Sequence, residues 1–68
     1  MNIKINRRES KVKKLIKFYL YDIDSQMVWQ GQYWTGSLKQ ALLFGIRSDA
    51  EAESRRQYAK LNKLLSEF

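Results

Sequence analysis

The segment KLIKFYLYDIDSQMVWQGQYW (residues 14–34) contains two runs of strand-forming residues separated by a turn. The run from 14 to 23 is rich in Ile, Phe, Tyr and Leu, and the run from 27 to 34 is rich in Trp, Tyr and Val. These residue types favour β-strands. Asp24 and Ser25 lie between the runs and supply turn chemistry. The pattern therefore predicts an antiparallel hairpin.

If the turn between the two runs has two or four residues, the two residue numbers of each facing pair sum to 49. One face of the hairpin is then almost purely apolar and is the predicted core side. Its pairs are Ile16/Tyr33, Phe18/Gly31, Leu20/Trp29 and Asp22/Met27. The opposite face mixes Lys, Gln, Tyr and Trp, and it is expected to point away from the core. Its pairs are Leu15/Trp34, Lys17/Gln32, Tyr19/Gln30 and Tyr21/Val28.

The rest of the chain supplies a further strand and two helices. Residues 1–5 alternate apolar and polar side chains, which predicts a short third strand. The Ser37–Gln40 spacing fits a capping box, so a helix is expected from there to Gly45. A second capping signal, at Ser48 and Glu51, opens a helix over 48–68. Its apolar stripe consists of Tyr58, Leu61, Leu65 and Phe68.

These elements predict a single small domain spanning residues 1–68. The expected fold class is α+β, with a small three-stranded antiparallel sheet packed on one face by two C-terminal helices (β-β-β-α-α). The order of the strands stays open. A core of this size supplies only about 3–5 kcal/mol of net stability.

The net charge of the chain lies at one end. The first 17 residues carry seven basic side chains and one acid, Glu9, whereas the other 51 carry six of each sign. Together they give the net charge of +6. Residues 7–14 (RRESKVKK) contain one apolar residue, so a basic, mobile loop or arm is expected there. Such a cluster neutralises phosphates and favours nucleic acid; the alternative is a solvated charge run that aids solubility.

The candidate binding residues join this basic segment to the mixed face of the hairpin. Tyr and Trp stack on unpaired bases, and Gln pairs with an adenine edge. Two alternatives stay open for the face, namely ordinary strand residues and an interface with another protein. The candidates are Lys4, Arg7, Arg8, Lys11, Lys13, Lys14, Lys17, Tyr19, Tyr21, Gln30, Gln32 and Trp34.

Catalysis is not expected from this sequence. The chain has no His and no Cys, so the usual general base and the usual zinc ligands are missing, and no cofactor or metal is predicted. The three glycines match no phosphate-binding spacing. Asp22 is the one acid of interest, because the predicted register turns it toward the apolar face. The alternative is a strand-end residue that is solvated or bonded to the turn.

Location and assembly are predicted only coarsely. No apolar run reaches the roughly 18 residues of a membrane span, and the N-terminus lacks a signal-peptide pattern. We therefore expect a soluble, cytoplasmic protein without a membrane partner. A homodimer stays open, with Leu43 and Phe44 as candidates for self-association because they fall off the helical stripe.

Residues Val28 to Thr35 (VWQGQYWT), running into a predicted helix, resemble the last strand and helix entry of plant AP2-type and phage integrase N-terminal DNA-binding domains. Those domains dock a three-stranded sheet, backed by a helix, in the major groove. The similarity covers about eight of 68 residues. The first two predicted strands lack the regular arginines of those families, and the second long helix is extra. The resemblance implies a sheet that contacts nucleic acid.

The first functional hypothesis is thus a small basic nucleic-acid-binding module. Its basic segment would contact phosphates and its aromatic and Gln face would contact bases. The alternative is an inhibitor or adaptor that binds a protein or ribonucleoprotein complex that handles nucleic acid. Short, basic, Cys-free proteins are common among phage and mobile-element products, including anti-defence proteins such as anti-CRISPRs, and this size and style keep the alternative open.

Overall fold

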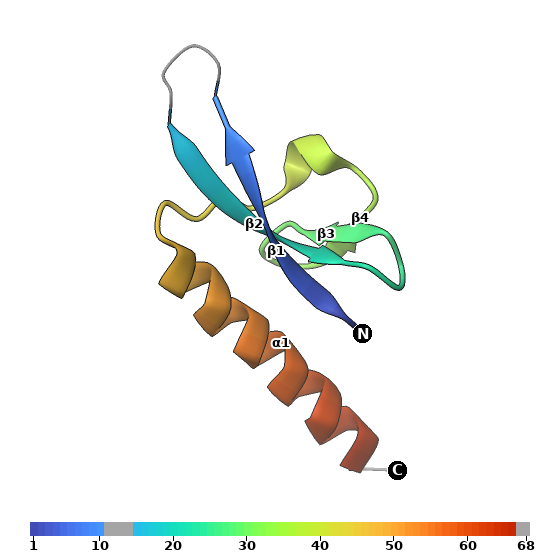
Figure 1. Cartoon of the computed structure of the whole chain (residues 1–68). Helices are drawn as coiled ribbons and strands as arrows, with labels where there is room; N and C mark the ends of the chain where they lie inside the picture. Colours follow the sequence, from blue (N-terminus) through green and yellow to red (C-terminus); the bar gives the residue numbers. More distant parts are fainter. Residues whose placement is uncertain (11–14, 67–68) are drawn as a thin grey trace.

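A computed structural model describes residues 1–10 and 15–66. Its elements are β1 (Ile3–Glu9), β2 (Ile16–Asp22), β3 (Met27–Trp29), β4 (Trp34–Thr35), the 3-10 turn η1 (Leu38–Gln40) and α1 (Arg47–Ser66). The strands form one antiparallel sheet in the order β1-β2-β3-β4. The α1 helix runs along one side of this sheet and η1 lies on the other side (Figure 1).

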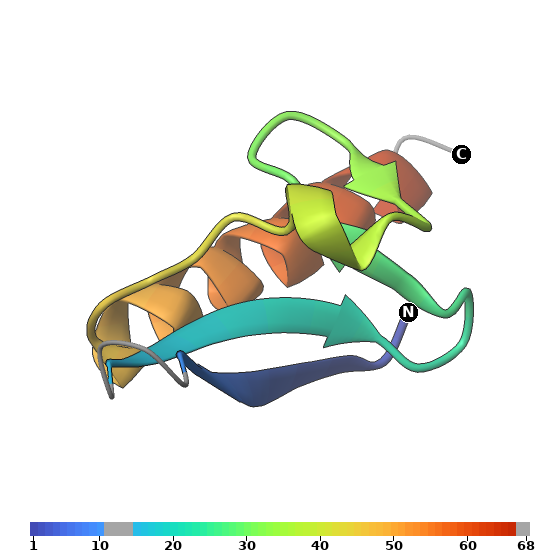
Figure 2. The same ribbon diagram turned by 90° about the horizontal axis from the view of Figure 1, so that it is seen from above.

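The α+β class is confirmed, but the count of elements is corrected. The described residues form four strands and one α-helix, where three strands and two helices were predicted. Figure 2 shows the strands side by side with α1 behind them. The additional strand arises in the second half of the predicted hairpin. The missing helix was expected in the segment that follows it.

The first strand is longer than the predicted 1–5. β1 pairs with β2 along its whole length, from Ile3 facing Asp22 to Glu9 facing Ile16. A seven-residue partner strand satisfies backbone groups that would otherwise stay unpaired. Residues 7–9 of the expected basic loop are therefore strand, and residues 11–14 of that loop lie outside the described residues.

The predicted register is confirmed next to the turn and fails further away. Tyr21 faces Val28 and Asp22 faces Met27, as the sum of 49 requires. β3 then ends at Trp29, because the chain reverses at Gly31, where φ is +117°. Trp34 consequently faces Trp29. Residues 27–34 are a second hairpin instead of one long strand, so the likeness to a continuous DNA-binding strand over Val28–Thr35 is lost.

The place predicted for Gly31 beside Phe18 is taken by Phe44. The Phe18 N–H donates to the Phe44 carbonyl at 2.8 Å, and the Phe44 N–H donates back at 2.7 Å. Leu42 likewise donates its N–H to the Trp29 carbonyl at 2.8 Å. The predicted helix over 37–45 is therefore wrong beyond η1, and Ser37 makes no side-chain cap. Sheet hydrogen bonds outweigh the local helical pattern here.

The core sits between the sheet and α1. Leu20 and Ala50 are fully buried, Trp29 is 6% exposed, and five partly buried residues pack against them. These are Ile3, Ile5, Phe18, Trp34 and Phe44. Burial of Leu20 and Trp29 was predicted, whereas Tyr33 is 53% exposed. Tyr33 is exposed because it follows the reversal at Gly31 and never reaches its predicted place beside Ile16.

The second predicted helix is present, although its buried face differs from the predicted stripe. Ala50 and Gln57 are buried, Tyr58 and Leu61 are half-buried, and Leu65 is 63% exposed. Phe68 lies outside the described residues. The Tyr58 hydroxyl accepts a hydrogen bond from the Ile3 N–H at 2.7 Å, which ties α1 to β1.

Candidate functional site

Alternation along β1 and β2 gathers six polar and aromatic side chains on the sheet face opposite α1. Because residues that face each other across a ladder point the same way, three cross-strand pairs share this surface. We call it the outer sheet face, and its pairs are Lys4/Tyr21, Asn6/Tyr19 and Arg8/Lys17. Lys4 and Arg8 are exposed, whereas Asn6, Lys17, Tyr19 and Tyr21 are half-buried. The surface thus offers three cations and two tyrosine rings within two neighbouring strands.

The electrostatics of the outer sheet face are unbalanced. Arg8 lies directly opposite Lys17, and like charges in that position destabilise a sheet. Within residues 1–10 and 15–66, neither of them nor Lys4 forms an ion pair with a carboxylate. The ion pairs seen join Arg47 to Glu51, Arg56 to Glu53, and the N-terminus to Asp24. The outer sheet face is therefore a surface that an anion would stabilise.

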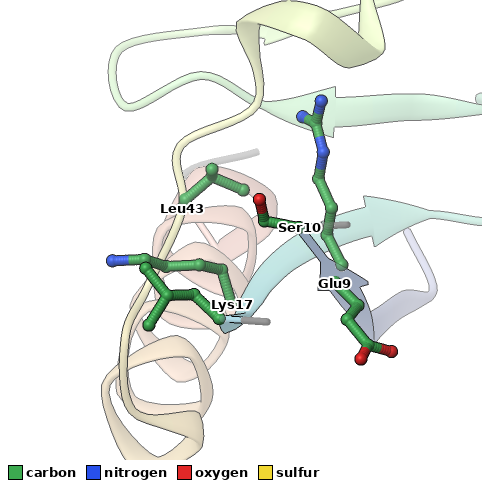
Figure 3. A pocket seen from close by; sticks show the side chains of 6 residues that line it. Glu9, Ser10, Lys17 and Leu43 are labelled. Carbon is green, nitrogen blue, oxygen red and sulfur yellow. The ribbon is translucent and has the colours of Figure 1, made fainter. Parts of the chain in front are cut away.

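A pocket of about 400 Å³ opens at one end of this surface. Its lining consists of Arg8, Glu9, Ser10, Leu15, Lys17 and Leu43. The Glu9 carboxylate points in a different direction from the Lys17 ammonium (Figure 3), which fits the alternation of β1. The Lys17 side chain extends toward the loop at Gly45, where a Cβ would lie 3.9 Å from its Nζ. The pocket lining therefore combines two cations, Arg8 and Lys17, with one acid, Glu9.

The structure separates the other predicted site residues from this face. Arg7 faces Phe18 and so belongs to the side of the sheet that α1 covers. Gln30 is half-buried, and its side-chain carbonyl accepts the Gln32 N–H at 3.3 Å. Trp34 packs on Trp29 with ring centroids 5.5 Å apart. Lys11, Lys13 and Lys14 lie outside the described residues. The early end of β3 is the physical reason that the glutamines and Trp34 leave the predicted surface.

Asn6 is a member of the outer sheet face that the sequence did not single out. Its side-chain amide donates to the Tyr19 hydroxyl at 3.4 Å, a long contact between two groups that are both able to bond a base. The sequence signal for Asn6 was its place between Lys4 and Arg8 at alternate positions, which puts the three side chains on one face of a strand. It could be recognised only if the first strand was known to extend beyond residue 5.

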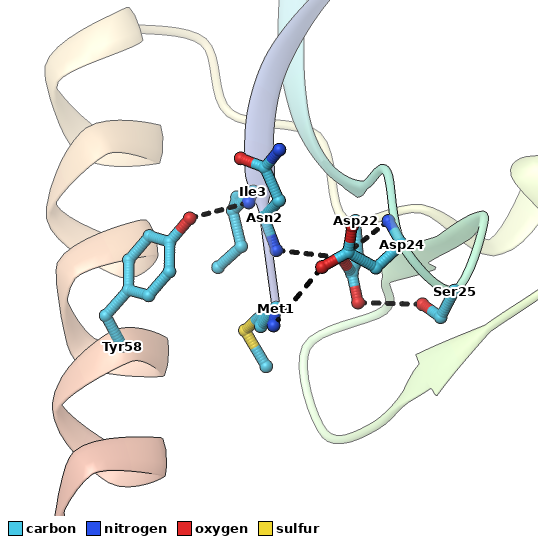
Figure 4. A network of polar contacts seen from close by, with 7 residues as sticks. All are labelled: Met1, Asn2, Ile3, Asp22, Asp24, Ser25 and Tyr58. Carbon is cyan, nitrogen blue, oxygen red and sulfur yellow. Dashed lines mark hydrogen bonds and ion pairs between the residues drawn. The ribbon is translucent and has the colours of Figure 1, made fainter.

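Asp22 is buried, at 7% exposure, and is bonded to the turn and the N-terminus. Its carboxylate accepts hydrogen bonds from the Asn2 N–H at 3.1 Å, the Asp24 N–H at 3.2 Å and the Ser25 hydroxyl at 2.8 Å (Figure 4). Burial by itself raises the pKa of Asp22, but these hydrogen bonds and the N-terminal ammonium outweigh it and hold the pKa below the ordinary value of an aspartate. Asp22 therefore matches the alternative given for it, a strand-end residue that is bonded to the turn.

A second surface, which the sequence did not indicate, lies on the α1 side of the sheet. It is a groove of about 360 Å³ between the β3–β4 hairpin and the second half of α1. We call it the aromatic groove; its walls include Trp29, Tyr33, Trp34, Lys60, Leu61 and Leu64. The Lys60 ammonium lies 6.0 Å from the Trp29 ring centroid, and the buried Trp29 indole N–H has no acceptor among the described residues.

Comparison of the chain with protein-family models, curated proteins and solved structures finds no match. In the described part of the chain, no three carboxylates gather in a way that could hold a metal ion. No helix within that part is long and apolar enough to span a bilayer. The function is therefore inferred from the side chains of the outer sheet face and of the aromatic groove.

Proposed function

We propose that this protein binds single-stranded nucleic acid through the outer sheet face. The observation that carries the proposal is the Arg8/Lys17 pair, two facing cations that form no ion pair within the described residues, on the same surface as two tyrosines. Lys4, Arg8 and Lys17 contact phosphates, and Tyr19 and Tyr21 stack on bases. A positively charged surface with aromatic side chains is the usual arrangement for binding single strands.

The spacing of the tyrosines supports a single strand over a duplex. Tyr19 and Tyr21 are alternate residues of β2, so they lie about 6.8 Å apart along the strand. That distance is about twice the roughly 3.4 Å repeat of one strand in duplex DNA. The spacing thus leaves room for one unstacked base between neighbouring rings, and a single strand offers unstacked bases whereas a duplex keeps its bases stacked on one another.

Binding of a short fluorescent oligothymidylate, followed by anisotropy at several salt concentrations, tests the proposal. Arg8→Ala/Lys17→Ala should weaken binding and flatten the slope of log affinity against log salt by about 1.4, or about 0.7 for each lost contact. Tyr19→Ala should cost about 1–3 kcal/mol for the base it stacks on, while leaving the salt slope unchanged.

Arg55→Ala/Arg56→Ala is the matched control, since it removes the same charge from exposed positions on α1, which lies on the opposite side of the sheet. It should keep the wild-type salt slope. Equal losses in both double variants would mean that net charge alone drives binding, and the outer sheet face would then have no special role. Absence of binding to single strands at low salt would reject the proposal and favour the inhibitor or adaptor alternative.

A further inference from the structure

We infer that the aromatic groove is a docking site for a peptide segment of a partner protein, one that carries a leucine or phenylalanine next to a carboxylate. The groove lies on the α1 side of the sheet, and the outer sheet face lies on the opposite side. The two surfaces are therefore independent. The inference does not rest on nucleic-acid binding, and both surfaces can be occupied at once.

The apolar character of the groove comes from side chains that the fold leaves accessible. Tyr33 is 53% exposed and Leu64 is 56% exposed, one from each wall. Trp34 is half-buried against Trp29 and belongs to the same wall as Tyr33. Exposed apolar side chains that converge on one concave surface are typical of interaction sites. A volume of about 360 Å³ accommodates anchoring side chains of a peptide.

The charge of the groove selects the kind of peptide. Lys60 is an exposed cation at the wall, and none of the lining residues within the described part of the chain is acidic. Glu53, the nearest acid along α1 toward its N-terminus, is engaged by Arg56 at 2.9 Å and by the Gln57 side-chain amide at 3.0 Å. A carboxylate on the partner therefore complements Lys60, and its apolar neighbour fills the space between the walls. Electrostatic complementarity of this kind sets specificity and register.

Both tryptophans of the chain line the groove, so their emission reports its occupancy directly. The test selects peptides from a displayed random library that lacks Trp, using the full-length protein as bait. The enriched peptides should carry Leu or Phe beside Asp or Glu. A synthetic copy of the best peptide should change the intrinsic fluorescence, and replacing its acidic residue with Lys should weaken binding about tenfold or more.

Two neighbouring leucines supply a matched pair of variants. Leu64→Asp places a charge in the groove and should weaken peptide binding about tenfold or more. Leu65→Asp, at a residue that is 63% exposed and outside the lining, should bind like the wild type. Circular dichroism verifies that both variants fold. Lys60→Glu gives an independent test, because it should lose the acidic peptide and bind the Lys-containing copy instead.

Four outcomes would overturn the inference. One is a library without enriched peptides, and another is an enriched set without acidic residues. A third is equal binding by Leu64→Asp and Leu65→Asp. The fourth is a change of tryptophan emission that follows oligonucleotide addition or self-association while peptides have no effect. The groove would then bind nucleic acid or a second copy of the chain.

Discussion

Asp22 holds together the turn that organises the sheet. Two backbone N–H groups and one hydroxyl converge on its carboxylate, from Asn2 on one side and from Asp24 and Ser25 on the other. Hydrogen bonds to a charged acceptor stabilise a protein by about 1.5–3 kcal/mol each, before the cost of burial is subtracted. The residue that looked most like a catalytic acid is therefore a structural link between β1 and the β2–β3 turn.

Asp22→Asn should destabilise the protein by about 1–3 kcal/mol near neutral pH, because the donors lose a charged acceptor. The lowered pKa of Asp22 means that its stabilisation is present above the unfolded-state pKa and is lost as the pH falls through the folded-state pKa. Urea unfolding at neutral pH and in acid, where Asp22 becomes protonated, should thus show a smaller acid-induced loss in the variant than in the wild type. Glu9→Gln, at an exposed residue outside this network, is the control; an identical acid loss in wild type and Asp22→Asn would contradict the expectation.

At the scale of elements, the short β3–β4 hairpin and the segment after it determine the surface. Because β3 stops at Trp29, Phe44 completes the hydrogen bonds of Phe18, and the chain from η1 to α1 is held in an extended path. The same reversal places Tyr33 and Trp34 beside α1, where they form one wall of the aromatic groove. A single change of direction at Gly31 thus creates the groove and removes the glutamines from the outer sheet face.

Gly31→Ala should destabilise the hairpin by about 1–3 kcal/mol, because φ of +117° is a conformation that side chains rarely adopt. The cost is in the backbone, since an added Cβ would meet Leu42 at an ordinary 3.6 Å. Gly36→Ala is the control, as its Cβ would meet no atom within 4 Å. Thermal unfolding should show a clear loss for the first variant and little change for the second; similar melting curves would show that the reversal tolerates a side chain.

At the scale of the whole molecule, one cluster connects every layer. Leu20 from β2, Trp29 from β3 and Ala50 from α1 form the buried core, and the partly buried residues around them come from β1, β2, β4 and the segment at Phe44. A domain this small has a net stability of only about 3–5 kcal/mol. Loss of one central contact therefore affects the sheet, the hairpin and the helix together.

Leu20→Ala should cost about 2–5 kcal/mol, which is enough to unfold much of the population at room temperature. Leu15→Ala removes the same atoms from a residue that is 50% exposed, and its effect should stay within about 0.5 kcal/mol. Far-UV circular dichroism against temperature measures both. A cooperative transition near the wild-type temperature for Leu20→Ala would mean that the core does not depend on this side chain.

The sequence by itself determined the features that depend on neighbours in the chain. Turn chemistry at Asp24 and Ser25 established the register of Tyr21 with Val28, and alternation in β2 separated Leu20 from Tyr19. The capping and charge pattern also predicted the long helix. These signals are local, because strand alternation and helix capping act over a few residues.

Only the tertiary structure decided where β3 ends, what pairs with Phe18 and which candidate residues meet. The Ser37–Gln40 capping pattern favoured a helix, yet residues 42–44 form sheet hydrogen bonds with Trp29 and Phe18. Completing the open edge of β2 satisfies backbone groups from distant parts of the chain, and this gain exceeds a weak helical preference. The outer sheet face kept Lys17, Tyr19 and Tyr21 together because they share one strand. It lost Gln32 and Trp34 because their position depended on a non-local pairing that another segment took.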